Sequence, residues 1–268
     1  MASRDTTKKI SLLAFTIAIA FIVFWAAGCG SDLTPAEKNA KRILDNCIQK
    51  TETIKTVEVT GTIKASQSDG RYADRTSSGV FAKTDTGEPI SKFEISGRVI
   101  TGVDENVTHY YFKGYDYFNT GNGWKKTAAL SPLSLTWVVK NATNFRIVSS
   151  DSNSIKIACD INPAALWKSQ GVRIQPGTAL SRSVENARIS DVFEVNKNGS
   201  PLESYSSVWR LLNPTSKGNL PLTVTTACHY SGYGSPVTFQ VPPEALGARM
   251  YDIFHPYPSV NGYGLQPL

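Results

Sequence analysis

The sequence predicts an α+β chain that is mainly β, in which one N-terminal helix precedes a strongly curved antiparallel sheet. Apolar residues recur at helical spacing within residues 34–50, and from Lys55 onward the apolar period changes to two. Turn residues then separate a long series of strand-like runs. Several runs are long and polar on one face, which indicates a twisted, curved sheet with one solvated side.

The first element is a helix that begins at Thr34. Thr34 can cap the first amides, Pro35 suits the first helical position, and Glu37 completes a capping box. An apolar stripe follows at helical spacing, formed by Ala36, Ala40, Ile43, Leu44, Cys47 and Ile48. We expect about four turns of helix, which must bury this stripe on another element.

Strands are expected over most of residues 57–128. The first alternates Val57, Val59 and Ile63 with polar residues, as a half-buried strand does. Turns rich in Gly, Asp and Asn then separate further strands. These are expected at residues 72–83, 90–100, 107–112, 115–119 and 124–127.

The second half combines short helices with more strands. Residues 130–141 are expected to connect the two halves, with a helix near 133–139, and another short helix is expected at 164–170. Strands are expected at residues 145–149, 154–161, 188–196, 202–211, 220–230 and 237–241. We expect residues 171–187 to form a mobile surface loop. Residues 242–246 would form a last helical turn, and residues 249–268 a poorly ordered tail.

Residues 1–28 have the three parts of a secretory signal. Lys8 and Lys9 precede an apolar run that stops at small residues before Cys29. The sequence of residues 26–29, AAGC, resembles the lipobox of bacterial lipoproteins, in which diacylglycerol alkylates the cysteine and the peptide is cut before it. Residues 29–33 would then be the lipid anchor and linker, and residues 34–248 the folded domain. The alternative is an uncleaved membrane helix, since residues 10–27 just reach spanning length.

Charge and cysteine usage bound the function classes. The chain has 28 basic and 22 acidic side chains, and loss of residues 1–28 would leave 25 and 21, a net charge of +4. This excess is spread along the chain, without the basic cluster that a nucleic-acid partner requires. Cys47, Cys159 and Cys228 would remain as buried thiols. A disulfide between Cys159 and Cys228 is the alternative.

The residue pattern indicates a non-catalytic protein and predicts no cofactor. The chain contains no CxxC pair and no HExxH, GxSxG or paired SxxK motif. Its three histidines, at positions 109, 229 and 255, are too scattered for a metal-ligand cluster. Cys228 and His229 are adjacent on a predicted strand and would point to opposite faces. We therefore expect neither catalytic residues nor a metal site.

Aromatic residues are the candidates for a ligand site. We single out Tyr111, Tyr117 and Trp124 from the aromatic-rich residues 110–124, together with Trp137 and Trp167 from the predicted helical segments. Rigid amphipathic rings suit the lining of a lipid site. The alternatives are ordinary cross-strand packing for the hairpin aromatics and core packing for the two helical tryptophans.

The order of one helix, many strands, a helical interruption and more strands resembles the LolA/LolB-like superfamily, which includes the LppX and LprG type lipoproteins. The residues that carry the resemblance are 111–118 (YFKGYDYF), 123–126 (GWKK) and 237–248 (VTFQVPPEALGA). With the lipobox, the resemblance covers residues 29–248. It implies an open half-barrel whose sheet wraps around helices and encloses an apolar cavity. Members of the superfamily bind acyl chains, glycolipids or whole lipoproteins there.

The expected function is that of a membrane-anchored lipoprotein on the extracytoplasmic side of a bacterial cell membrane. It would bind an amphiphile, such as a lipid, glycolipid or acyl chain, and transport between membranes is one use of such binding. Its partners would be the membrane, through lipidated Cys29, and that ligand, and we expect a monomer. The alternative is a non-catalytic protein-interaction or sensing module of the cell envelope.

Lipidation of Cys29 can be tested by metabolic labelling. Labelled fatty acid should enter the wild-type chain and not the Cys29→Ala variant, because the thiol is the attachment point. Fluorography of the membrane fraction measures this. Equal labelling of both chains, or no labelling of the wild type, would contradict lipidation and favour the uncleaved helix.

Overall fold

A computed structural model describes residues 33–99, 102, 104–119, 121–128, 135–169, 175–215, 218–237 and 239–250 of the chain. The expected signal segment, Cys29 and residues 251–268 of the expected tail lie outside the described residues. The described part is organised around one antiparallel sheet of eleven strands. The expected class, α+β and mainly β, is confirmed.

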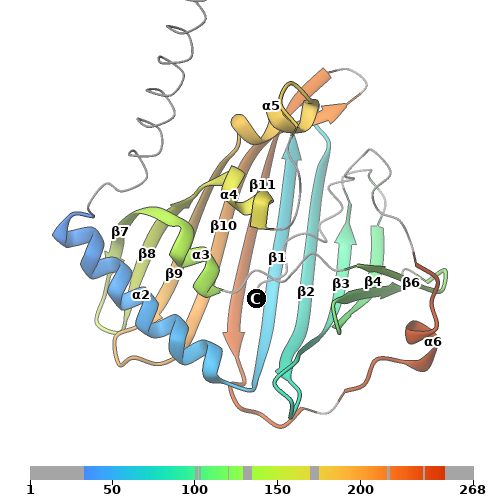
Figure 1. Cartoon of the computed structure of the whole chain (residues 1–268), viewed down its shortest axis with the longest axis horizontal. Helices are drawn as coiled ribbons and strands as arrows, with labels where there is room; N and C mark the ends of the chain where they lie inside the picture. Colours follow the sequence, from blue (N-terminus) through green and yellow to red (C-terminus); the bar gives the residue numbers. More distant parts are fainter. Residues whose placement is uncertain are drawn as a thin grey trace, which may run out of the picture.

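The sheet has the strand order β6-β5-β4-β3-β2-β1-β11-β10-β9-β8-β7 (Figure 1). It is therefore two meanders, joined where the first strand pairs with the last. The first contains β1 (Thr56–Gln67), β2 (Tyr72–Lys83), β3 (Pro89–Arg98), β4 (Asp104–Phe112), β5 (Tyr115–Asn119) and β6 (Trp124–Ala128). The second contains β7 (Ala142–Ser150), β8 (Ser154–Ile161), β9 (Arg188–Asn196), β10 (Leu202–Thr215) and β11 (Gly218–Ser231).

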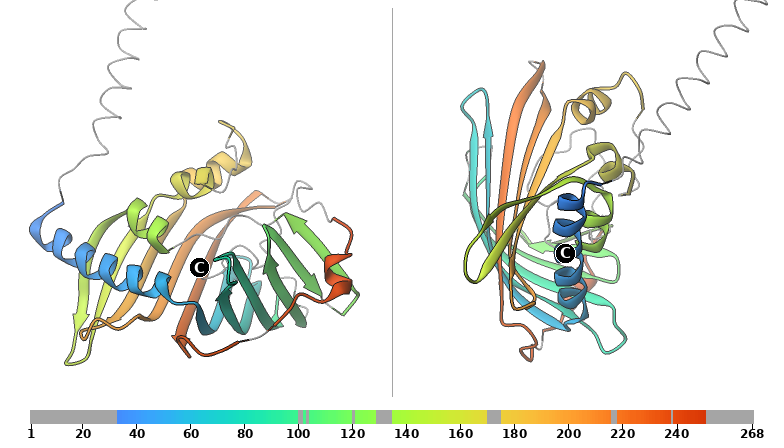
Figure 2. Two further views of the ribbon diagram at one scale, coloured as in Figure 1. Left: turned by 60° about the horizontal axis from the view of Figure 1, so that its bottom comes forward. Right: turned by 90° about the vertical axis from the view of Figure 1, so that its left-hand side faces the viewer.

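The two faces of the sheet differ chemically. Side chains alternate between the faces along each strand, and residues paired across strands share a face. The inner face is the face on which the helix α2 (Pro35–Thr53) packs, and it carries Val59, Phe93, Phe193 and Tyr230 of one large apolar cluster. The outer face carries their neighbours in sequence. Figure 2 shows the sheet curving around the helices on its inner side.

Helix α2 forms as its sequence predicts. Thr34 Oγ1 accepts a hydrogen bond from the Glu37 amide at 3.3 Å, and Glu37 Oε2 accepts one from the Thr34 amide at 2.9 Å. Four apolar residues of the stripe are buried, namely Ala40, Leu44, Cys47 and Ile48, whereas Ala36 is exposed. Burial of a Leu or Ile side chain contributes about 1.5–3 kcal/mol, so this stripe holds α2 on the sheet.

Three short helices accompany α2 on the inner side of the sheet (Figure 2). They are α3 (Leu135–Asn141), α4 (Pro163–Ser169) and α5 (Ala179–Glu185). Helix α5 corrects the expectation of a loop over residues 171–187. It begins after Thr178, whose Oγ1 accepts a hydrogen bond from the Ser181 amide at 3.1 Å. This cap satisfies one of the free amides at the helix start.

Residues 237–241 form no strand among the residues that the structure describes, which corrects a second expectation. Phe239 and Val241 pack instead on the outer face, in a cluster with Tyr110 and Tyr117. Prolines at positions 236, 242 and 243 lack the amide donors that a strand pairing would use. The last helical turn is present as α6 (Pro243–Leu246), which lies beside β5 and β6.

A hydrogen-bonded threonine joins α2 to the sheet, and its removal should lower stability. Thr51 Oγ1 donates to the Cys47 carbonyl at 2.9 Å and accepts from the Leu202 amide at 2.9 Å. Both Thr51 and Leu202 are buried. Thr51→Val leaves that amide unpaired, so we expect the free energy of unfolding to fall by about 1–3 kcal/mol, measured by urea denaturation.

Thr53→Val is the matched control. Thr53 lies in the same last turn, is exposed, and donates to the Lys50 carbonyl at 2.7 Å. Its removal should change stability by less than about 0.5 kcal/mol. An equal loss of unfolding free energy in the two variants would show that the contact between Thr51 and Leu202 contributes nothing specific to stability.

Candidate functional site

The inner face extends beyond the helices that pack on it. Helices α2 and α3 lie over the second meander, whereas no described helix has an extended contact with β1, β2, β3 or β4 (Figure 1). We call the inner face of β1–β4 the helix-free inner face. Its apolar side chains are nevertheless buried, and they include Ile63, Ala65 and Val107.

Small residues occupy the centre of this helix-free inner face. The register places Gly61, Ala65, Ala73, Ser77 and Gly97 close together there. At Gly97 the backbone itself requires glycine, because φ is 123° and a Cβ would lie 2.3 Å from the Asp74 carbonyl oxygen. The inner face therefore lacks side-chain bulk between its larger apolar residues.

A row of polar side chains crosses the inner face at one level of the register. Successive neighbours in the row are Asp191 on β9, Ser207 on β10, Thr226 on β11, Ile63 on β1 and Arg75 on β2. All except Ile63 are polar, and each of these polar residues exposes at most 3% of its surface. Buried polar groups in proteins nearly always have partners, so the partners of this row bear on function.

Asp191 is held by hydroxyl groups. Ser207 Oγ donates to Asp191 Oδ1 at 2.5 Å, and Trp209 Nε1 donates to Ser207 Oγ at 2.7 Å. Burial raises the pKa of Asp191 to about 7, although hydrogen bonds from Ser207 and Tyr205 act in the lowering direction. The carboxyl group is therefore poised to change protonation near neutral pH.

Three of the aromatic residues predicted from the sequence lie on the inner side. Tyr111 on β4 pairs with Ser91 on β3 and shares the inner face with it. Trp137 of α3 packs against the large inner cluster, and Trp167 is half-buried on α4, whose Leu166 belongs to that cluster. These three residues come from different elements, and the structure places them on one side of the sheet.

The other two predicted aromatic residues, Tyr117 and Trp124, lie on the outer face. Tyr117 is 2% exposed and belongs with Tyr110 to a cluster that residues 239–245 cover. The rings of Tyr110 and Trp124 lie 5.7 Å apart, an ordinary distance for packed aromatic side chains. In this position both residues serve the packing of the C-terminal segment on β4–β6.

A buried histidine, paired with an aspartate, lies near Tyr111 on the inner face. His109 Nε2 lies 3.0 Å from Asp116 Oδ1, and the His109 side chain is 4% exposed. Burial, and then the charge of Asp116, raise the pKa of Tyr111. His109 lies on β4 and Asp116 on β5, so the contact links two neighbouring strands of the inner face.

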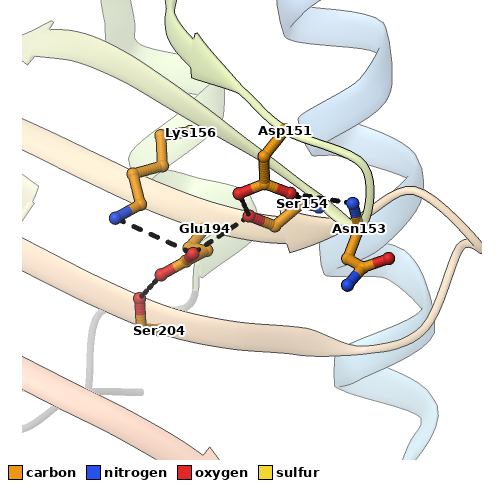
Figure 3. Close-up of polar contacts among 6 residues, drawn as sticks. All are labelled: Asp151, Asn153, Ser154, Lys156, Glu194 and Ser204. Carbon is orange, nitrogen blue, oxygen red and sulfur yellow. Dashed lines mark hydrogen bonds and ion pairs between the residues drawn. The ribbon is translucent and has the colours of Figure 1, made fainter.

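The outer face of the second meander is polar and solvated. Glu194 Oε1 lies 3.8 Å from Lys156 Nζ and accepts from Ser154 Oγ at 3.1 Å, while Glu194 Oε2 accepts from Ser204 Oγ at 3.0 Å (Figure 3). Two shallow depressions, of about 310 and 420 Å³, also lie on outer-face residues of β1–β3 and their neighbours. Neither depression touches the predicted aromatic residues.

The cysteines are free thiols, which confirms the first of the two expectations for them. Cys47, Cys159 and Cys228 are all buried and unbridged. Cys159 and Cys228 lie three strands apart in the sheet, about 14 Å at the usual strand spacing, which exceeds the reach of a disulfide. Burial raises the pKa of Cys47 to about 11 and that of Cys228 to about 12, so neither is a reactive thiolate.

The described residues contain neither a candidate membrane span nor a candidate metal cluster. No helix there is both long enough and apolar enough to cross a bilayer. The same residues contain no group of three or more His, Cys, Asp or Glu side chains that could hold a metal ion.

Sequence reasoning missed the buried polar row, although a signal was present. In β9 the inner-face positions read Ile189, Asp191, Phe193 and Val195, so an acid occupies the apolar phase of an alternating strand. Arg75 similarly occupies the phase of Gly79 and Phe81 in β2. A charged residue in the apolar phase of a strand is the pattern that would have identified both.

The structure is similar in fold to several solved structures. It matches LprF from Mycobacterium bovis with 14% sequence identity and a TM-score of 0.44, covering 76% of this chain and 97% of that one. A LolA superfamily protein from Nitrosomonas europaea matches with 6% identity and a TM-score of 0.26, covering 76% and 94%. A DUF1329 family protein from Desulfovibrio piger matches with 8% identity and a TM-score of 0.33, covering 76% and 96%.

No protein-family model and no curated protein matches the chain. The superfamily that the sequence resembles is present among the structural matches. At identities of 6–14% and TM-scores below 0.5, these matches concern the path of the chain alone.

The raised pKa of Asp191 predicts a pH dependence of stability. Between pH 3.8 and about 7 the folded chain holds a proton on Asp191 that the unfolded chain has released. The contribution of this group to stability therefore falls as pH rises through that window. Asp191→Asn should remove this pH dependence. At pH 8 the free energy of unfolding of the variant should therefore exceed that of the wild type by an amount on the order of a few kcal/mol.

Thermal and urea unfolding at pH 5 and pH 8 would measure this difference. Asp74→Asn is the control, because the Asp74 side chain is 53% exposed on the outer face and lies 3.6 Å from Lys64 Nζ. Its pH profile should follow that of the wild type. A profile of Asp191→Asn that also runs parallel to the wild type would rule out a protonated native Asp191.

Proposed function

We propose that the chain is a membrane-anchored lipoprotein of the bacterial envelope that binds an amphiphile on its inner face. The ligand class is a lipid, a glycolipid or an acyl chain. The observation that carries the proposal is the helix-free inner face, where apolar strand residues such as Ile63 and Val107 continue without a helix over them. Ligand sites are lined mostly by apolar side chains, and an acyl chain is the occupant that suits such a lining.

The small residues of this face support the same occupant. Gly61, Ser77 and Gly97 present almost no side chain toward the inner side of β1–β3. A flexible acyl chain can follow such a curved, low surface and contact the backbone as well as neighbouring side chains. Tyr111, at the β4 side, and Trp137 and Trp167, on the helices, are the predicted aromatic residues that we assign to ligand contact.

The membrane anchor in this proposal is Cys29, as the lipobox resemblance implies. The described fold begins at α2, only a few residues after Cys29. Such a short linker would hold the inner face within reach of a membrane, where amphiphiles reside. The proposal includes no catalytic step.

The alternative is a non-catalytic interaction or sensing module of the envelope. Ile147 and Val148 support it, since they are 44% and 51% exposed on β7, a strand at the edge of the sheet. Exposed apolar residues on an edge strand are suited to another protein chain. Two register shifts in the pairing of β7 with β8 weaken this edge as a template, however.

Two adjacent serines on β2 provide a test of the ligand site. Ser77 is half-buried on the inner face, and Ser78 is exposed on the outer face. Ser77→Trp should reduce the lipid that copurifies with the chain at least about tenfold, because an indole would fill the space between the small residues. Ser78→Trp should leave it unchanged.

Native mass spectrometry of chains purified from membranes measures the bound lipid, and circular dichroism checks that both variants fold. Equal lipid in the two variants would contradict binding at the inner face. A wild-type chain that repeatedly carries no lipid, and crosslinks to one stoichiometric protein partner, would favour the interaction module.

A further inference from the structure

The buried arginine on the inner face lacks the partners that a buried charge normally has. Arg75 is 3% exposed, and its Nε and Nη2 atoms are buried with no hydrogen-bond partner. It takes part in no ion pair with any residue that the structure describes. Burial of an uncompensated cation is costly, so the cost must be offset by something that the described residues do not supply.

The strand neighbours of Arg75 on the inner face have mostly small side chains. Its neighbour on β3 is Gly97, and its neighbours along β2 on the same face are Ala73 and Ser77. Only Ile63, paired with it on β1, is a large side chain among these neighbours. A planar guanidinium surrounded by such small residues can offer its N–H groups to an oxygen anion in a bidentate manner.

A second unpartnered polar atom lies at the same level of the sheet. Thr226 Oγ1 is buried without a hydrogen-bond partner, and Thr226 pairs with Ile63 on the side away from Arg75. Two strand spacings place the Cα atoms of Thr226 and Arg75 about 10 Å apart. An oxygen-bearing group above Ile63 would thus have a guanidinium on one side and a hydroxyl on the other.

The acidic residues of the same row do not neutralise Arg75. Glu105 shares its level on β4 but lies two strands away, with Gly97 between them. Asp191 lies four strands away in the opposite direction, about 19 Å at the usual spacing, and its carboxylate is bonded to Ser207. Nε and Nη2 of Arg75 are therefore open to an anion brought from outside the described part of the chain.

We propose that Arg75, with Thr226 opposite it, binds the anionic headgroup of the amphiphile that occupies the helix-free inner face. The group is a phosphate, a phosphodiester or a carboxylate, which share oxygen atoms of suitable geometry and a negative charge. This inference rests on the proposed function and adds the class of ligand to it. The acyl portion lies over the apolar residues of β1–β4, and the headgroup oxygens accept hydrogen bonds from the N–H groups of Arg75.

The test compares two lipids that differ only in a phosphate, namely 1-lauroyl lysophosphatidic acid and 1-monolauroylglycerol. Inorganic phosphate is the third probe. Each is titrated calorimetrically, the lipids below their critical micelle concentrations, into the full chain freed of copurified lipid. The wild type should bind the lysophosphatidic acid at least about tenfold more tightly than the glyceride, since a hydrogen bond to a charged group contributes at least that much.

Arg75→Gln should weaken binding of the lysophosphatidic acid at least about tenfold and leave the glyceride within about twofold. Thr226→Val should weaken the same phosphate-dependent binding by a smaller factor. Arg98→Gln is the matched control. Arg98 is an arginine of the neighbouring strand β3 on the outer face, stacked 5.0 Å over the Tyr72 ring, and its loss should change neither affinity.

The stability of the empty chain separates a ligand role from a structural one. Loss of an uncompensated buried charge should leave the melting temperature of Arg75→Gln unchanged or higher. A lower melting temperature would assign Arg75 to the fold and overturn the proposal. Unchanged affinity for the lysophosphatidic acid in Arg75→Gln would also overturn it.

The remaining outcomes distinguish failure of headgroup binding by Arg75 from failure of amphiphile binding by the chain. Inorganic phosphate that binds as tightly as the lysophosphatidic acid, and depends on Arg75, would assign the site to a free anion and overturn the headgroup assignment. If neither lipid binds the wild type, the proposed function fails. If the glyceride and the lysophosphatidic acid bind equally well, amphiphile binding stands and the role of Arg75 falls.

Discussion

An eleven-stranded sheet with one apolar face and few helices is the constraint on which this structure depends. Alternation of side chains fixes an inner and an outer face along every strand, and the apolar inner face must be removed from water. Helix α2 and the short helices after it pack on the second meander. The inner face of the first meander is left without a described helix, and the proposed function follows from that imbalance.

The described inner face contains one buried acid, Asp191 on β9, and one buried arginine, Arg75 on β2, and the two differ in how their charge can be neutralised. The Asp191 carboxyl accepts a hydrogen bond from the Ser207 hydroxyl. Its raised pKa also allows it to take up a proton and become neutral in its buried position. Arg75 has no such route, because a guanidinium stays protonated in proteins. The acid is therefore a group that the fold can neutralise by itself. The arginine is one that only a negative partner can neutralise.

The sequence predicted the positions of most strands, but it did not predict on which face of the sheet the aromatic residues lie. Alternation and turn residues predicted most strands to within a few residues, since both are local properties. Helix α5 was missed because its cap, Thr178, is a common residue in loops. The outer position of Tyr117 and Trp124 depends on the register of β4–β6 and on residues 239–245 packing there. A local sequence pattern does not predict such long-range pairings.

The pairing of the first strand with the last bears on how the chain reaches this state. Each meander contains only neighbours in sequence, whereas β1 and β11 are joined across almost the whole domain. Closing that ladder carries the largest loop entropy in the fold. Until β11 has been made, β1 presents a long unpaired edge, which is the feature most prone to wrong association. The last segment of the sheet to be made is thus the one that unites the two halves.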